Sequence, residues 1–170
     1  MGEGDRGAYQ ELLQRYASRL HQFALRLTRS PAEAEDIVQD TFMRLWVHAA
    51  DYDPKARPTT WLHRIAHNLA VDRLRARGRL TELDDEAEPA AGPSSQASLV
   101  DAKRRTEGLY RALDALPERQ ATAIGLVHLQ GLSGKEAAEV MGLGEEALES
   151  LLARGRRALK ARLATESELR

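Results

Sequence analysis

Residues 59–77 are the stretch of the chain whose residue types are best suited to binding nucleic acid. An aromatic residue, Trp61, stands near Asn68 and a row of arginines. Aromatic rings stack on unpaired bases and arginines contact the phosphate backbone, so this set fits single-stranded DNA. Arg64 and Asn68 lie four residues apart, which places them on one helical face and lets them line one pocket. The alternative, which the periodicity alone favours, is a core Trp61 with solvated arginines.

A second candidate for DNA binding lies in residues 133–160. A short apolar segment with Ala137 and Ala138, a glycine turn at 142–144 and a longer basic segment follow one another there. This order is typical of a helix-turn-helix. Small residues let the first helix pack closely on the second, whose outer face would lie in the major groove with Arg154 and Arg157 near phosphates or guanine edges. A plain helical hairpin is the alternative.

No enzymatic or metal chemistry is predicted. His63 and His67 have the spacing of two zinc ligands, but no third ligand is apparent nearby. The acidic cluster 84–88 lacks the glycine turn that shapes a cation cage. The chain has no cysteine, which excludes thiol catalysis and Cys-bound metal. It also has no glycine-rich phosphate loop and no scaffold for a catalytic triad. We therefore expect a protein that is not an enzyme and needs no cofactor.

The charge of the chain is segregated along its length. The net charge is only −1, but residues 28–54 and 80–100 are acidic whereas residues 55–79 and 154–162 are strongly basic. Such segregation suggests more than one kind of partner, with nucleic acid suited to the basic blocks. Solvated helix faces are the plainer explanation of any single block.

Three amphipathic helices are predicted in the first part of the chain. Apolar residues at three- and four-residue steps predict helices over 8–28 and from residue 30 to a break at residue 51, with Trp46 on the apolar face of the second. A third helix is expected over 59–77, where Gly78 provides a stop. Together these helices predict a small helical domain.

Two helix starts carry a capping signature. Ser30 can cap the second helix, Pro31 fits its first position, and Glu33 can reach back as in a capping box. Ser133 and Glu136 have the same spacing ahead of a short apolar segment.

The second part of the chain is also predicted to be helical. Residues 84–98 are acidic and then rich in Pro, Ala and Ser without periodicity, which is typical of a linker. Beyond them, apolar periodicity predicts helices over 109–116, 117–130, 134–141 and 145–163. No strand pattern is present. The sequence therefore predicts an all-α fold of two small helical domains joined by a flexible linker.

Length and composition fit this organisation. The chain has 170 residues, of which 42% are hydrophobic, enough for packed cores in one or two domains. No run approaches the roughly 18 apolar residues of a membrane span, and the N-terminus lacks the apolar stretch of a secretory signal. A cytoplasmic protein without membrane insertion is expected.

Five segments, taken in order and spacing, resemble the bacterial extracytoplasmic-function (ECF) group of RNA polymerase sigma factors. They are Ala24–Thr28, Ala34–Phe42 with Trp46, Trp61–Ala70 with Asp72 and Leu74, Ala115–Arg119, and Gly131–Ser133 with Glu136–Ala138. The resemblance covers nearly the whole chain. It implies a sigma region 2 domain over 1–79, a flexible acidic linker over 80–100 and a sigma region 4 helix-turn-helix domain over 101–170.

The resemblance also implies roles for individual residues. The surface that binds core RNA polymerase would comprise Asp36, Gln39, Asp40 and Arg44. Recognition of the −10 element as a single strand, with a flipped base in a pocket, would involve Trp61, His63, Arg64, Asn68, Arg73 and Arg75. Recognition of the −35 element as duplex would involve Glu149, Ser150, Ala153, Arg154 and Arg157.

The chain departs from the family pattern in its last helix. Many relatives carry Lys or Arg where this chain has Glu149 and Leu151, and a bulkier residue in place of Ala153. Glu149 removes a cationic contact but can accept a hydrogen bond from a cytosine amino group. Leu151 is expected either to pack inside or to meet a protein. Glu145 stands where relatives often bury an aliphatic residue.

The expected function is that of an alternative sigma factor. Its partners would be core RNA polymerase, promoter DNA and an anti-sigma factor. One alternative is a helix-turn-helix regulator that binds duplex operators without polymerase. The other is a sigma-like protein-interaction module that titrates a regulator. Promoter-dependent transcription with purified core enzyme distinguishes the initiation factor from both.

Overall fold

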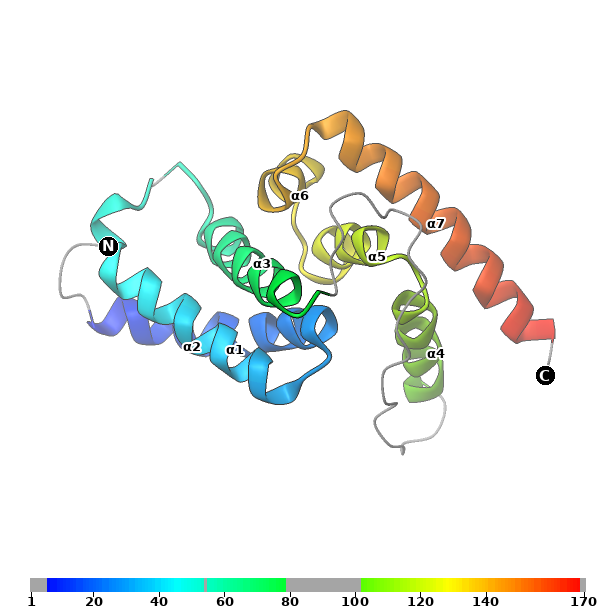
Figure 1. The fold of residues 1–170 in the computed structure, drawn as a ribbon, viewed down its shortest axis with the longest axis horizontal. Coiled ribbons are helices and arrows are strands. Elements are labelled where there is room, and N and C mark those ends of the chain that lie inside the picture. Colours follow the sequence, from blue (N-terminus) through cyan, green and yellow to red (C-terminus); the bar gives the residue numbers. More distant parts are fainter. Residues whose placement is uncertain (1–5, 54, 79–101, 169–170) are drawn as a thin grey trace.

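The computed structural model describes residues 6–53, 55–78 and 102–168, and every regular element in these ranges is helical (Figure 1). The first three α-helices are α1 (Arg6–Thr28), α2 (Pro31–Val47) and α3 (Pro58–Ala76), with a 3-10 turn, η1 (Ala49–Asp51), after α2. The predicted all-α class is confirmed. The acidic linker predicted at 80–100 lies outside the described residues.

The start of α2 differs from the prediction in one contact. Ser30 caps the helix, since its Oγ accepts from the Glu33 N–H at 3.4 Å, and Pro31 occupies the first turn. The Glu33 carboxylate, however, forms an ion pair with Arg77 at the end of α3. The Ser30 N–H donates instead to Thr28 Oγ1 at 3.4 Å. The long-range ion pair has therefore replaced the second half of the capping box.

The N-terminal bundle packs around large apolar side chains from all three helices. These buried side chains are Leu20, Phe23, Ile37, Phe42, Leu45 and Leu62. Tyr9 of α1 meets Phe42 of α2 edge-on, with ring centroids 6.0 Å apart. Aromatic pairs in this geometry add to the stabilisation that burial provides. The bundle holds α2 and α3 side by side, so their outer faces are presented together.

The C-terminal bundle contains α4 (Ala102–Asp114), α5 (Glu118–Ile124), α6 (Gly134–Met141) and α7 (Glu145–Glu168). A π-helical turn, η2 (Gly125–Leu129), continues α5 and was not predicted from the sequence. Ser133 and Glu136 form both halves of the predicted capping box at α6. Gly142 has a φ of +66°, the left-handed conformation that ends α6 and starts the turn into α7.

Gly155 fixes how closely α7 approaches α5. A Cβ atom at this position would lie 2.6 Å from Ile124 Cδ1 and 3.4 Å from Gln120 Cβ. A larger residue here would have to displace the end of the Ile124 side chain, so glycine favours this close packing of the two helices. The close contact sets the position of α7, the helix predicted to read DNA.

The two bundles contact one another. In Figure 1, α6 lies against α3, and residues of both helices are in direct contact. Arg29, after α1, also donates from Nη2 to the Asp114 carbonyl at the end of α4 at 3.1 Å. The sequence predicted two domains but contained no signal for this contact between them.

Candidate polymerase and nucleic-acid interfaces

The outer face of α3 carries three of the predicted −10 residues. Arg64 and Asn68 are both exposed and lie one helical turn apart. Arg75 is also exposed, nearer the end of the helix. The structure thus brings Arg64 and Asn68 together on one face, as their spacing predicts.

Trp61 is half-buried at the start of α3. Its ring lies 5.3 Å from that of Tyr52, and the Tyr52 hydroxyl donates to the Ala56 carbonyl. Trp61 therefore fits each of the two interpretations in part, as a core residue and as a residue that can stack on a base. One part of the ring packs on the bundle, and the rest is available at the surface.

His63 is turned into the protein, away from the exposed face of Arg64. The side chain is fully buried, with Nδ1 2.7 Å from the Thr59 carbonyl and Nε2 3.1 Å from the Gln130 side chain. Its ring also meets Phe23 edge-on at 5.2 Å. Burial lowers the pKa of His63 below its ordinary value, and the hydrogen bonds with Thr59 and Gln130 oppose that shift only in part. In this arrangement His63 does not share a pocket with Arg64 and Asn68.

Arg73 joins the predicted DNA-binding helix to the predicted polymerase-binding helix. Its Nη2 donates to Asp40 Oδ2 at 2.9 Å, and its Nη1 donates to the Glu33 carbonyl at 3.0 Å. A guanidinium is well suited to this bridge, since its planar fork can serve a carboxylate and a carbonyl at once. The residues assigned to two different partners are thus neighbours in the free chain.

The outer face of α2 is more apolar than the sequence analysis predicted. Asp36, Gln39 and Arg44 are exposed, and Asp40 is half-buried beside Arg73. Met43, which lies between Asp40 and Arg44, is 64% exposed. Val47, which follows Arg44, is 71% exposed. Their spacing of four residues, off the stripe that carries Ile37 and Leu45, is the signal that could have revealed this patch.

Trp46 departs from its predicted place on the buried face of α2. It is 41% exposed, and its ring rests edge-on against Tyr9 at 5.1 Å. The ring covers part of the side of α1 through this contact with Tyr9. It extends the exposed apolar surface of α2 toward the first helix.

The polar face of α7 holds the predicted −35 residues. Glu149, Ser150, Ala153 and Arg157 are exposed and Arg154 is half-buried. Positions 150, 153, 154 and 157 follow the spacing of one helical face. Leu151 was expected either to pack inside or to meet a protein. It is 2% exposed and therefore packs inside. Glu145 is exposed, as are its neighbours at the start of α7.

Glu149 lies close to the first residue of α6. Its Oε1 would be 3.4 Å from a Cβ atom at Gly134. The carboxylate is therefore near the positively polarised N-terminal end of that helix, where a negative charge is favourable. This position explains how a glutamate is tolerated on a face that is otherwise suited to DNA.

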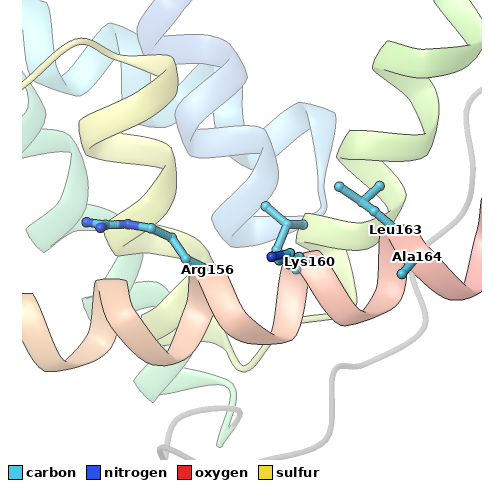
Figure 2. Close-up of a pocket in the computed structure, with 5 residues that line it drawn as sticks. Arg156, Lys160, Leu163 and Ala164 are labelled. Atoms are coloured by element: carbon cyan, nitrogen blue, oxygen red, sulfur yellow. The ribbon is translucent and has the colours of Figure 1, made fainter.

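A shallow groove runs along the second half of α7, lined by Arg156, Leu159, Lys160, Leu163 and Ala164 (Figure 2). None of these residues belongs to the predicted −35 set. Within 6–53, 55–78 and 102–168 no group of three or more His, Asp or Glu side chains is arranged to hold a metal ion. Over the same ranges no helix is both long and apolar enough to cross a membrane.

Comparison with known families accounts for both bundles. The model for Sigma-70 region 2 matches residues 12–80, and the model for Sigma-70 region 4 matches residues 106–159. The ECF RNA polymerase sigma factor SigM of Bacillus subtilis is 31% identical, over 89% of this chain and 92% of that protein. The chain belongs to the ECF sigma factor family. The SigE sigma factor of Mycolicibacterium smegmatis is 33% identical over 96% of this sigma factor, which spans 66% of that relative's length.

Solved structures match both bundles of this sigma factor together. RpoE of Bartonella quintana, in complex with the anti-sigma factor NepR, gives a TM-score of 0.71 at 27% identity over 92% of this chain and 97% of that one. CnrH, in complex with the cytosolic domain of CnrY, gives 0.68 at 28% identity over 95% and 91%. Because each bundle is less than half of the chain, scores of this size require both bundles to superpose in similar relative positions.

Proposed function

We propose that this chain is an alternative sigma factor that directs core RNA polymerase to its promoters and is controlled by an anti-sigma factor. The observation that carries the proposal is that sigma region 2 and sigma region 4 occur in order on two folded bundles, each with an exposed polar face where the family pattern requires one. The chain supplies recognition and strand capture, and the polymerase supplies the chemistry.

The exposed face of α2 is the proposed site for core polymerase. Helix-on-helix docking needs an apolar centre with a charged rim. Met43 and Val47 provide the centre, and Asp36, Gln39 and Arg44 provide the rim. Exposed apolar side chains on a folded protein commonly mark an interaction site.

The exposed face of α3 is the proposed site for the −10 strand. Trp61 can stack on a base, Asn68 can bond to a base edge, and Arg64 and Arg75 can contact phosphates. Flipping a base out of the duplex costs a few kcal/mol. The single strand must therefore bind better than the duplex, and promoter opening follows from that difference in affinity.

The polar face of α7 is the proposed site for the −35 duplex. Arg154 and Arg157 lie on the face that would enter the major groove, flanked by Ser150 and Ala153. Glu149 at the edge of this face can accept from a cytosine amino group. Selection of bound sequences from a random promoter library would identify the preferred bases.

The test is transcription from cloned promoters by purified core polymerase, with and without this chain. Transcripts that require both the chain and a particular upstream sequence support the proposal. Tight binding to duplex DNA without core polymerase, and no transcripts, would favour the helix-turn-helix regulator. Neither activity, together with capture of a regulator, would favour the interaction module.

Control by an anti-sigma factor is tested separately. The structural relatives RpoE and CnrH were solved with NepR and CnrY bound. A protein encoded beside this chain is expected to bind it and to abolish promoter-dependent transcripts when added before core polymerase. Unchanged transcript levels would reject that protein as the inhibitor.

A further inference from the structure

Arg73 lies on the side of α3 opposite the face proposed to bind the −10 strand. That face carries three exposed residues, Arg64, Asn68 and Arg75. Arg73 follows Arg64 by nine residues, which is about 180° around a helix of 3.6 residues per turn. It therefore continues the stripe on which Ala66 and Leu69 are buried. The stripe directs its side chain, which is 27% exposed, toward α2 and away from the proposed DNA site.

The guanidinium of Arg73 is bonded to two places on α2 at once. Nη2 donates to Asp40 Oδ2 at 2.9 Å, and Nη1 donates to the Glu33 carbonyl at 3.0 Å. Hydrogen bonds with an ionised donor are stronger than neutral ones, and the first of these also has an ionised acceptor. To reach a strand on the opposite side of α3, the side chain would have to leave both partners.

A second arginine attaches α3 to the same side of α2. Arg77 follows Arg73 by one turn and forms an ion pair with the Glu33 carboxylate. Glu33 and Asp40 are seven residues apart, which is about two turns of α2. Two arginines of the basic block 55–79 thus hold α2 in place, so the charge of that block overstates its capacity to bind DNA.

Asp40 borders the exposed apolar patch of α2. It lies four residues after Asp36 and three before Met43, so the three side chains are neighbours on the helix surface. The Asp40 side chain is 46% exposed. A carboxylate accepts several hydrogen bonds, so the bond from Arg73 leaves capacity for a donor of a partner. A side chain that is already fixed also loses less conformational entropy when the partner binds.

We infer that Arg73 is a positioning residue for polymerase binding, which fixes the Asp40 carboxylate at the edge of the α2 patch for a donor group of core polymerase, and that it does not contact the −10 strand. This inference rests on the function proposed for α2. The family resemblance implies a DNA contact for Arg73, and the bonds to α2 replace that role. Removing Arg73 frees the carboxylate to adopt other rotamers, so the cost falls on affinity for polymerase.

The first test measures affinity for purified core polymerase without DNA, by titration of the fluorescently labelled chain. Arg73→Gln is expected to weaken binding about fivefold, the effect of one hydrogen bond that is no longer aligned. The matched control, Arg15→Gln, makes the same change in charge on the exposed surface of α1 and is expected to bind as the unmodified chain does. Equal affinities of the two variants would overturn the inference.

Arg77→Gln separates positioning of Asp40 from general support of the fold. It removes the other attachment of α3 to α2 but does not touch Asp40. We expect Arg77→Gln and Arg73→Gln each to lower the free energy of unfolding by urea, and only Arg73→Gln to weaken core binding. An equal loss of core affinity in both variants would overturn the inference, because Arg73 would then act only by holding the helices together.

Two further variants keep the test decisive. Arg73→Lys retains the charge but cannot serve a carboxylate and a carbonyl at once, so an intermediate loss of core affinity is expected. This variant, compared with Arg15→Lys, decides the matter if Arg73→Gln does not fold. Adding Arg73→Gln to Asp40→Asn should cost little further core affinity, since the carboxylate is already absent. Losses that multiply in the double variant would contradict an action through Asp40.

The DNA side of the inference is tested by salt dependence. The full chain is titrated with a short fluorescein-labelled single-stranded DNA of random sequence at several salt concentrations. Arg75→Gln is expected to reduce the slope of log affinity against log salt by about 0.7, the value for one phosphate contact on a single strand. Arg73→Gln is expected to leave the slope unchanged, and a reduction equal to that of Arg75→Gln would overturn the inference. Equal slopes in all three forms would support the role of Arg73 and remove the phosphate contact proposed for Arg75.

The unmodified chain separates failure of this inference from failure of the proposed function. If it does not bind core polymerase, the proposed function fails and the inference fails with it. If it binds and Arg73→Gln binds equally well, only the inference fails.

Discussion

Asn68 and His63 show how neighbouring residues on one helix can have opposite roles. Asn68 is exposed, whereas His63 is enclosed between Phe23 and Gln130. Their five-residue spacing places them on different sides of α3. The base pocket that the family resemblance implies would therefore involve Arg64 and Asn68 without the imidazole of His63.

Replacing Asn68 by alanine is expected to slow open-complex formation about fivefold, because one hydrogen bond to an unpaired base is worth about 1 kcal/mol. Affinity for core polymerase should not change, since the side chain lies on α3 and not on the exposed face of α2. Stopped-flow fluorescence of a labelled promoter and a separate core-binding titration measure the two quantities. An equal loss in both would argue against a base-contacting role.

His67 contributes a pH dependence to the folding stability that a substitution can isolate. Burial lowers its pKa from 6.5 to about 4, against a weaker opposing hydrogen bond with Asn68. The unfolded chain therefore takes up a proton below pH 6.5 while the folded protein does not, so stability falls as pH falls. The loss attributable to His67 approaches about 3 kcal/mol near pH 4.

Replacing His67 by glutamine, which does not titrate, should reduce the loss of folding stability that occurs as pH falls. The measurement is the free energy of unfolding by urea between pH 7 and pH 4. His63 contributes in the same direction, since its pKa is also lowered, so some slope remains in the variant. A variant with the same slope as the unmodified chain would show that His67 is not protonated on unfolding in this range.

The proposed binding of core polymerase depends on the exposed face of α2. Met43→Glu places a charge at the centre of the apolar patch and is expected to weaken core binding at least tenfold, as removal of a central interface residue does. Folding stability should hardly change because the side chain is 64% exposed. Ala32→Glu, an exposed position at the start of the same helix, serves as the charge-matched control. Similar affinities of both variants for core polymerase would show that the polymerase does not bind this patch.

The packing of α7 on α5 depends on Gly155, which has no side chain. Alanine at Gly155 gains up to about 1 kcal/mol of helix propensity but must displace Ile124, which is 3% exposed and has little room to move. Overpacking of this kind costs about 1–3 kcal/mol. We therefore expect a net loss of about 1 kcal/mol in the free energy of unfolding.

Adding Ile124→Val to Gly155→Ala is expected to restore part of that loss, because valine lacks the Cδ1 atom that lies 2.6 Å from the new Cβ. Thermal unfolding of the two single variants and the double variant completes the comparison. Additive losses in the double variant would show that the two positions do not compete for space.

Local elements were largely predictable, but contacts between distant elements were not. Capping at Ser133, the stop at Gly78 and the apolar stripes of α1 and α3 depend on neighbours within a turn, which the sequence displays. The pairing of Glu33 with Arg77 and the exposure of Trp46 depend on helices that meet only after folding. The same limit applies to His63, whose partner Gln130 is remote in sequence.

At the scale of the whole molecule, the contact between the bundles should respond to salt. Arg57–Glu136 and Arg64–Glu139 are at least partly exposed, and the screening length falls to about 3 Å at 1 M salt. The distribution of distances between spin labels at Ala32→Cys on α2 and Ala161→Cys on α7, both exposed, is therefore expected to broaden as salt rises. A distribution insensitive to salt would assign the contact to His63, Gln130 and apolar packing alone.

Both sides of the α3–α6 contact belong to one polypeptide. The fraction of molecules that form the contact is therefore independent of protein concentration, because formation is an intramolecular step. The fraction of molecules that form the contact changes when a partner binds one of the two surfaces or when salt screens its ion pairs.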